Sequence, residues 1–397
     1  MTTRAVAPIV LLLSAAPALA QDRSTDRVSA ETVASVSMFS NWSQPSVVLD
    51  GTATIRMGER TVGLVRPWVW QRPDGSWTSE WYQLQIRYES NTRLPVRVDA
   101  GIIPSPLGLG TLEMRPDLNP TVAPPFYYVA PLPRFDRTFD ALQVISGGYP
   151  LGLVVSTSGA HWDARGGVTN STPARARAEM KSGQPPSMSQ MIIGGGVSPI
   201  PGLRIGAGFG HGRYRDPRPA FVTSPSDSVT PPDQPPQAVG FPAADATVSN
   251  VEAEYAFSHT RLKGEWVWDR FETTSAPVSA SGFFVEAAQT FTPRWFGATR
   301  LTSASAPTPF TSADAHARAT TAEAIAGYRL TRELTLRAGY YAQRYYNAPV
   351  WDQQLCASVV WARLLTSSPS VASCTTARAS TPYSASSPPL AVVPPRA

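Results

Sequence analysis

Charge and long apolar runs are both scarce in this chain of 397 residues. Asp, Glu, Lys and Arg together make up only 16% of it. After residue 20, no stretch approaches the roughly 20 continuous apolar residues that a membrane-spanning helix needs, which excludes a helical membrane protein. The formal net charge of +5 is small and is not gathered in a basic run, which argues against nucleic-acid binding.

Lysine, cysteine and histidine are also rare. Only Lys181 and Lys263 are lysines among the 34 basic residues. Cys356 and Cys374 could pair in an oxidising compartment, but we interpret Cys356 as a small strand residue and Cys374 as part of a low-complexity tail. The four histidines lack the spacing of metal ligands, so no metal and no cofactor are expected.

The first twenty residues have the pattern of an export signal. Arg4 is followed by an apolar run over residues 6–13 and then by small residues that end in Ala18-Leu19-Ala20. This pattern predicts a cleavable signal peptide over residues 1–20 and a mature chain that begins near Gln21. At the other end, residues 366–397 are mostly Ser, Thr, Pro and Ala, and we expect a disordered tail.

Between these ends, apolar and polar residues alternate with a period of two in segments of about ten residues. Such alternation gives a β-strand one apolar and one polar face. In two neighbouring segments, the residues expected on the apolar face are Tyr82, Leu84, Ile86 and Tyr88, then Leu94, Val96, Val98, Ala100 and Ile102. The sixteen predicted strands are 33–41, 47–56, 60–70, 78–88, 93–103, 149–157, 160–170, 189–197, 201–210, 247–256, 259–269, 281–291, 294–304, 320–330, 333–344 and 353–363.

The connections between these strands alternate between short and long. Tight turns are expected near Ser90, Ser158, Pro201, Ser258, Pro293 and Thr331, and long loops at 171–188, 211–246, 270–280, 305–319 and 345–352. Residues 104–148, rich in proline, form the third long-side loop, which has room to enter the lumen and narrow it. Aromatic pairs near strand ends, such as Trp68 with Trp70, Trp77 with Trp81 and Trp266 with Trp268, are typical of interfacial girdles.

A soluble β-sandwich would also alternate, but the even number of strands and the loop asymmetry favour a membrane barrel. We therefore predict an all-β protein in which residues 21–365 form a transmembrane antiparallel β-barrel of about 16 strands. A barrel of this size leaves an aqueous lumen. The expected location is the bacterial outer membrane, reached through the periplasm, with membrane lipids around the barrel.

Three short segments carry a resemblance to a known family. GIIPSPLGLG at 101–110, GGYPLG at 147–152 and SVVWAR at 358–363 resemble the start and the end of the long third loop and the closing strand of outer-membrane general porins. The likeness extends more distantly to the phosphate-selective porin O/P group, whose clustered lysines this chain lacks. The resemblance implies passive uptake of small hydrophilic solutes by a monomer or homotrimer. Porins usually end on an aromatic residue, whereas here a long tail follows Trp361.

Charged side chains on the polar faces and in the third loop are the candidate pore-lining residues, because opposed charges across a water-filled constriction set ion preference. They are Arg87, Arg97, Asp99, Glu113, Arg115, Asp117, Arg165, Glu252, Glu254, Arg261, Lys263, Glu265 and Arg337. We expect no enzymatic activity. Ser156 and Asp163 near His161 are the only candidates for a catalytic Ser-His-Asp triad, and serine is too common in this chain for their proximity to indicate one. The alternative function is a non-conducting barrel that acts as a scaffold or surface-interaction protein.

Overall fold

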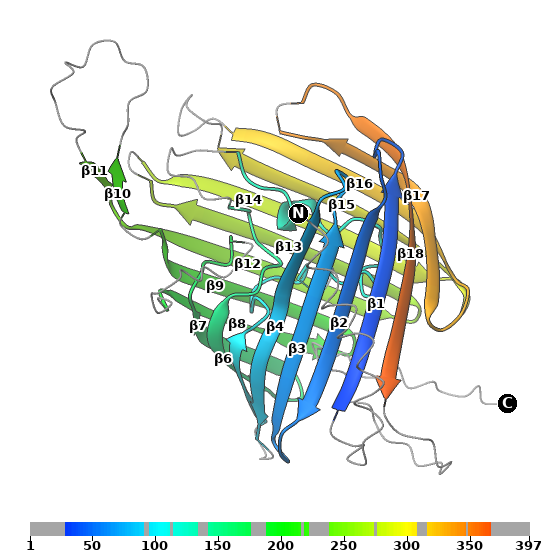
Figure 1. The fold of residues 1–397 in the computed structure, drawn as a ribbon, viewed down its shortest axis with the longest axis horizontal. Coiled ribbons are helices and arrows are strands. Elements are labelled where there is room, and N and C mark those ends of the chain that lie inside the picture. Colours follow the sequence, from blue (N-terminus) through cyan, green and yellow to red (C-terminus); the bar gives the residue numbers. More distant parts are fainter. Residues whose placement is uncertain are drawn as a thin grey trace.

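The computed structural model describes residues 28–90, 95–111, 114–133, 142–175, 188–215, 218–221, 238–273, 276–307, 316–346 and 348–366. The predicted signal peptide, Glu113, Cys374 and the predicted tail beyond residue 366 lie outside these ranges. Sixteen antiparallel strands form one closed barrel (Figure 1). Within the described ranges, no helix has the length and apolar character needed to cross a membrane.

The barrel strands follow one another around the ring in chain order, and β18 closes it by pairing with β1. In order, they are β1 (Val28–Phe39), β2 (Ser46–Arg56), β3 (Thr61–Gln71), β4 (Trp77–Glu89), β5 (Val96–Ile102), β6 (Leu151–Ser158), β7 (Trp162–Thr169), β8 (Gln190–Ile200), β9 (Leu203–Arg215), β12 (Ala244–Phe257), β13 (Thr260–Phe271), β14 (Val278–Thr290), β15 (Trp295–Pro307), β16 (His316–Arg329), β17 (Leu334–Arg344) and β18 (Asp352–Thr366).

Each of the sixteen predicted strands overlaps one barrel strand, so the predicted fold class is confirmed. The first strand begins at Val28 instead of residue 33. The prediction of a plain loop over 211–246 was wrong, because β10 (Arg218–Phe221) and β11 (Ala238–Phe241) form a separate two-stranded sheet. Strands of four residues are too short to show a period of two, and this hairpin projects beyond the barrel rim (Figure 1).

All the predicted tight turns lie at one end of the barrel. They join β4 to β5, β6 to β7, β8 to β9, β12 to β13, β14 to β15 and β16 to β17. The first residues of β1 and the last residues of β18 lie at the same end of the barrel. The longer connections lie at the opposite end. The segment between β5 and β6 is the third connection at that end, as predicted.

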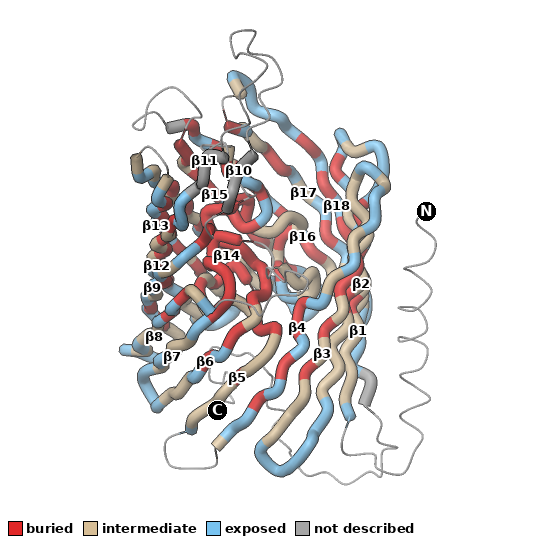
Figure 2. Tube along the Cα trace, turned by 60° about the vertical axis from the view of Figure 1, so that its left-hand side comes forward, coloured by how far each residue is buried: buried red, intermediate tan, exposed pale blue. Residues whose placement is uncertain are grey.

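Burial alternates along the strands, so the barrel has two different faces (Figure 2). Exposed residues on the outer face are large and apolar, including Leu84, Ile86, Leu153, Val155, Met191, Ile193, Val251, Trp266, Trp268, Val285, Leu301, Tyr340 and Leu355. Charged residues of the same strands turn inward. A continuous outward belt of this kind would be unfavourable in water and is the surface of a barrel embedded in hydrocarbon.

The outward placement predicted for Tyr82 was wrong. Arg66 pairs with Gln83 and Pro67 with Trp81, so Tyr82 is an extra residue in a β-bulge. Pro67 has no backbone N–H to donate to the ladder, which explains the bulge at this position. Tyr82 therefore turns inward and stacks between Trp68 and Tyr149, with ring centroids at 4.7 and 4.5 Å.

The outward placements predicted for Trp68, Trp70 and Ile102 were also wrong. Trp68 and Trp70 face the lumen rather than a lipid interface, and the Trp70 indole donates to the Ser46 hydroxyl at 2.7 Å. Ile102 is buried because it follows Gly101, whose φ of 124° interrupts the regular alternation.

Closure of the barrel predicts a specific cross-link. Ser37 and Ser358 are cross-strand partners on the inner faces of β1 and β18, and paired residues lie about 4.5–5.5 Å apart, within the range of a disulfide. In a background in which Cys356 and Cys374 are changed to Ser, we expect S37C/S358C to form a disulfide on oxidation, detected by mass spectrometry of non-reduced peptides. The control S37C/Q354C is displaced by about 13 Å along β18 and is expected to stay unlinked. Equal yields from the two pairs would contradict this closure.

Candidate functional site

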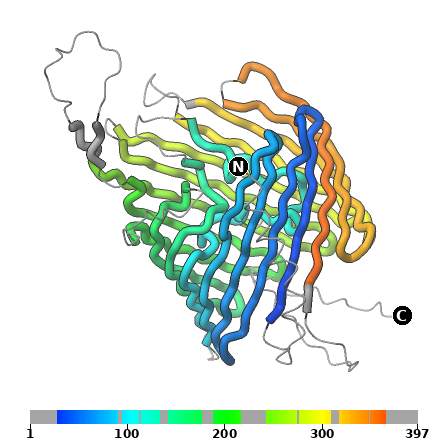
Figure 3. The backbone as a smooth tube through the Cα atoms, in the orientation of Figure 1, coloured from blue at the N-terminus to red at the C-terminus, as the bar shows by residue number. Residues whose placement is uncertain are grey.

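The segment between β5 and β6, residues 103–150 and here called loop 3, folds into the barrel (Figure 3). Its apolar side chains form one cluster with inward residues of the wall β12–β16: from the loop Leu107, Leu109, Phe126, Tyr127, Tyr128 and Ile145, and from the wall Ala246, Val248, Phe284, Ala304 and Ala319. The small alanines leave room for the loop's aromatic rings. Burial of this apolar surface holds the loop against one side of the lumen.

A first polar anchor holds the loop to β13. The carboxylate of Glu265 accepts hydrogen bonds from the Tyr127 hydroxyl at 3.1 Å and the Tyr128 hydroxyl at 2.6 Å. It also accepts from the backbone N–H of Leu109 at 3.3 Å and the side-chain amide of Asn250 at 3.1 Å. Burial raises the pKa of both tyrosine phenols, so both keep the proton that they donate.

A second anchor holds the turn at residues 116–123 to β16 and β17. Arg337 donates to the carbonyl of Pro116 at 2.7 Å and to the carbonyls of Asn119 and Thr121. On β16, Glu323 accepts from the backbone N–H groups of Val122 and Ala123, at 2.7 and 3.3 Å.

Arg300, on β15, completes this second anchor. It donates to the Ala123 carbonyl at 2.6 Å and to the Asn119 side chain at 2.9 Å, and it pairs with Glu286. Backbone groups of loop 3 at residues 116, 119 and 121–123 thus have charged hydrogen-bond partners on the wall.

The opposite wall, from β3 to β9, carries arginines that lie in front of buried carboxylates. On β4 and β5, Arg87 and Arg97 contact Asp99 at 2.7 and 3.1 Å. The side chain of Arg97 is 30% exposed, whereas that of Asp99 is 4% exposed. The positive group therefore faces the water and the negative group lies behind it.

A second group on β7, β9 and β12 has the same arrangement around Glu252. Arg204 contacts Asp163 at 2.8 Å and Glu252 at 2.5 Å, and Arg165 contacts the same Glu252 at 3.4 Å. The side chain of Arg165 is 24% exposed and that of Glu252 only 1%. Asp99 and Glu252 thus each contact two arginines, whereas the side chain of Asp163, at 25% exposed, lies nearer the water than that of Arg204, at 9%.

Inward glycines on β8 and β9 give these side chains their space. A Cβ on Gly206 would lie 2.8 Å from the Glu252 carboxylate, and one on Gly196 would lie 2.9 Å from the Arg204 guanidinium. A Cβ on Gly208 would lie 2.3 Å from Leu107 of loop 3. Because these glycines have no side chain, the ion pairs and loop 3 can pack directly against the backbone of β8 and β9.

A cavity of about 160 Å³ remains between loop 3 and this wall. Six arginines line it, Arg66, Arg87, Arg97, Arg115, Arg165 and Arg204, but only three carboxylates, those of Glu31, Asp99 and Glu252. Arg115 reaches into it from the loop and pairs with Asp117 at 2.7 Å and with Glu31 of β1 at 2.9 Å. Across the described part of the chain, no three His, Cys, Asp or Glu side chains are grouped to hold a metal ion.

The structure places the pore-lining residues proposed from the sequence in several parts of the lumen. Arg87, Arg97, Asp99, Arg115, Arg165 and Glu252 line the cavity, whereas Glu265 and Arg337 anchor the loop. Asp117 pairs with Arg115. On the inner face away from the cavity lie Glu254, Lys263, which is buried, and Arg261, which contacts Glu286 at 3.2 Å.

Several charged residues of the lumen were missed in the sequence. They are Glu31, Asp50, Arg66, Arg204, Glu286, Arg300 and Glu323. The signal was present for most of them, since Arg204 stands between Leu203 and Ile205 and Glu286 between Val285 and Ala287. The same alternation rule, applied to every strand, finds them.

No protein-family model and no curated protein sequence matches this chain. Solved structures do match. An outer-membrane protein of Vibrio cholerae, OmpT with loop L8 deleted, has 8% identity and a TM-score of 0.52, with 85% of this chain and 98% of that chain covered. The trimer form of in-vitro folded OmpT gives 0.51 at 8% identity and the same coverage. An anion-selective porin from Comamonas acidovorans gives 0.50 at 10% identity, with 85% and 99% covered.

The chain has the fold of a bacterial outer-membrane porin. At these identities the likeness shows the fold alone, and the likeness to the phosphate-selective group stays a prediction. Strand number and closure in this porin-type barrel agree with the prediction from alternation.

The Glu265 anchor predicts a selective loosening of loop 3. In E265L, three donors of the loop lose their acceptor in a buried place, at about 1–3 kcal/mol each. We expect hydrogen exchange of residues 107–128 to rise at least about a hundredfold, since 1.4 kcal/mol corresponds to a factor of about ten. E265Q keeps one acceptor oxygen for two of the four donors at this site, so its exchange is expected to lie between that of the wild type and that of E265L. The matched control is E254L, on the same wall. Equal exchange in E254L and E265L would contradict the anchor.

Proposed function

We propose that this protein is an outer-membrane channel for the passive diffusion of small hydrophilic solutes, with a preference for anions. The observation that carries the proposal is the cavity between loop 3 and the wall β3–β9, with six arginines against three carboxylates. Rings of arginine favour anions in narrow pores, because a low-dielectric wall strengthens the field of each charge. No covalent chemistry and no cofactor enter the proposal.

The ion pairs support this role by holding the arginines in fixed positions. A guanidinium bound to a carboxylate on one edge has a fixed orientation, and its planar fork of N–H groups matches the oxygens of an anion. Asp99 and Glu252 lie behind Arg97 and Arg165, so a solute in the cavity meets the positive groups first. A solute would then exchange water for guanidinium contacts and leave along its gradient.

A non-conducting barrel is the second candidate, and one observation favours it. Loop 3 packs against β12–β16 with several side chains fully buried, including Leu107, Tyr127 and Ile145, so it fills much of that side of the lumen. Under this alternative, the barrel serves as a scaffold for surface contacts. A homotrimer belongs to the channel proposal, since one similar structure is a trimer form.

The test is electrical. Refolded protein in a planar bilayer is expected to give discrete conductance steps, and the reversal potential across a KCl gradient is expected to show that chloride permeates more easily than potassium. In R97Q/R165Q, Asp99 keeps Arg87 and Glu252 keeps Arg204. The loss of two positive groups is expected to lower the chloride preference about thirtyfold, as about 1 kcal/mol for each of two close charges in water implies.

The control is R332Q, in the exposed turn between β16 and β17, which is expected to leave the reversal potential unchanged. Bilayers without conductance steps would remove the channel proposal and favour the scaffold. Conductance with a potassium preference would support the channel proposal but contradict the proposed preference for anions.

A further inference from the structure

The lipid-facing surface is interrupted by an apolar groove on β15–β18 and β1. Gly297, Ala326, Ala338, Ala357 and Met38 are successive cross-strand partners on the outer face of these five strands. Four of them carry a methyl group or no side chain, so the wall is hollowed along a line perpendicular to the strands. Elsewhere on the outer face, large residues such as Ile86, Ile193 and Val285 stand out from the strands.

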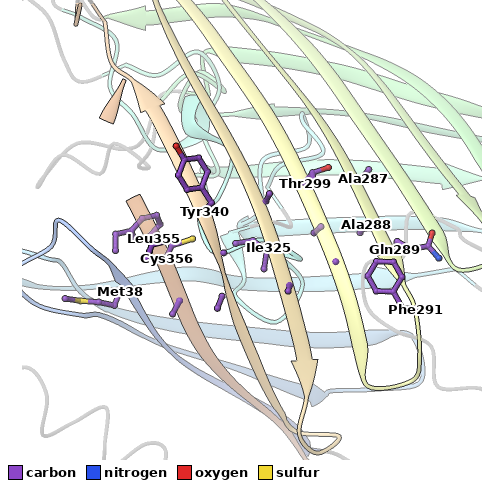
Figure 4. Close-up of a pocket in the computed structure, with 18 of the residues that line it drawn as sticks. Met38, Ala287, Ala288, Gln289, Phe291, Thr299, Ile325, Tyr340, Leu355 and Cys356 are labelled. Atoms are coloured by element: carbon purple, nitrogen blue, oxygen red, sulfur yellow. The ribbon is translucent and has the colours of Figure 1, made fainter. Parts of the chain in front are cut away.

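Larger side chains bound the groove on both sides. One ridge is the neighbouring row of partners, Trp295, Tyr328, Leu336 and Val359. The other consists of Tyr340 and Leu355, and it falls away at Thr299 and Ala324, where the hollow widens towards Ala287 (Figure 4). The hollow has a volume of about 1030 Å³, and its lining includes the row from Gly297 to Met38 together with Thr299, Ala324, Tyr340, Leu355, Ala287 and Phe291.

The shape and lining of the groove select a linear hydrocarbon. The groove crosses four strand spacings, about 19 Å in all. Because the strands of such barrels tilt by about 35–45°, the groove climbs about 12 Å through the membrane, which is within one leaflet of a hydrocarbon core about 30 Å thick. An extended acyl chain fits such a narrow, inclined groove. A second barrel could fill it only with a row of large side chains that crosses its own strands and has the same inclination to the membrane.

The end of the groove at Gly297, near the tight turns, lies beside a positive charge that can bind the phosphate of a lipid headgroup. Gly297 lies near the tight-turn end of β15, and the turn before it contains Arg294. Arg294 donates to the Tyr328 hydroxyl at 3.3 Å, and the Tyr328 ring lies 4.7 Å from that of Trp295. Tyr and Trp are typical of the membrane interface, and a guanidinium binds phosphate through paired N–H groups.

We propose that this groove binds one acyl chain of a glycerophospholipid from the leaflet at the tight-turn end, with the lipid phosphate at Arg294. The apolar trough between the two ridges holds the chain, and the interfacial group Arg294, Trp295 and Tyr328 fixes the headgroup. The inference is independent of the channel proposal, because its residues lie on the outer face or in the turn between β14 and β15 and none lines the lumen.

The proposal is tested by filling the groove. Purified protein in detergent is titrated with dioleoyl phosphatidylglycerol, and bound lipid is counted by native mass spectrometry. We expect one tightly bound lipid on the wild type. In A326L/A357L, which fills the groove from outside, we expect its affinity to fall about tenfold or more, because several CH₂ groups lose their contacts. R294Q removes the phosphate contact and is expected to weaken binding about tenfold as well.

The matched control is A207L/A253L, two outward alanines of β9 and β12 that lie outside the groove, and it is expected to bind as the wild type does. Heat-dependent gel migration verifies that each variant is folded. R294Q lies in an exposed turn, so it tests the site even if A326L/A357L fails to fold. Unchanged lipid binding in A326L/A357L or R294Q would overturn the proposal. A change in oligomeric mass in A326L/A357L would also overturn it and assign the groove to a second copy of the chain.

Discussion

Every backbone N–H and C=O inside hydrocarbon must find a partner within the protein, and the rest of this structure follows from that requirement. An open sheet would leave two edges unpaired, so β1 pairs with β18 and the sheet closes. Closure gives each strand one face towards lipid and one towards the lumen. Because successive side chains of a strand point to opposite faces, the alternation in the sequence is enough to place apolar residues outward and charged residues inward.

This sorting explains how much of the fold could be predicted from the sequence. A period of two in segments of about ten residues was enough to find all sixteen barrel strands. It failed at Tyr82, where the missing N–H of Pro67 shifts the register by one residue and reverses the face. It also failed at β10 and β11, which are too short for a period to appear.

The candidate site was less predictable than the fold, because alternation assigns a face but not a partner. The parity of Arg165 and Glu252 placed both on the inner wall, yet their contact depends on the pairing of β7, β8 and β9 with β12. Arg204 and Asp163 are 41 positions apart and meet only through Gly196, which stands between them in the sheet. Such contacts depend on register, which a single sequence does not contain.

Loop 3 changes the charge balance of the lumen, because it covers carboxylates of the wall and adds Arg115 to the cavity. It covers one side of the wall and supplies donors to Glu265 and Glu323, whose carboxylates are thereby withdrawn from water. On the opposite side, Asp99 and Glu252 are buried beneath their arginines. Carboxylates tolerate burial only where several donors meet them, and here guanidinium, phenol and backbone N–H groups fill that role. Because the long side chains of Arg97 and Arg165 extend past Asp99 and Glu252, the water beside these pairs contacts the positive groups more than the negative ones.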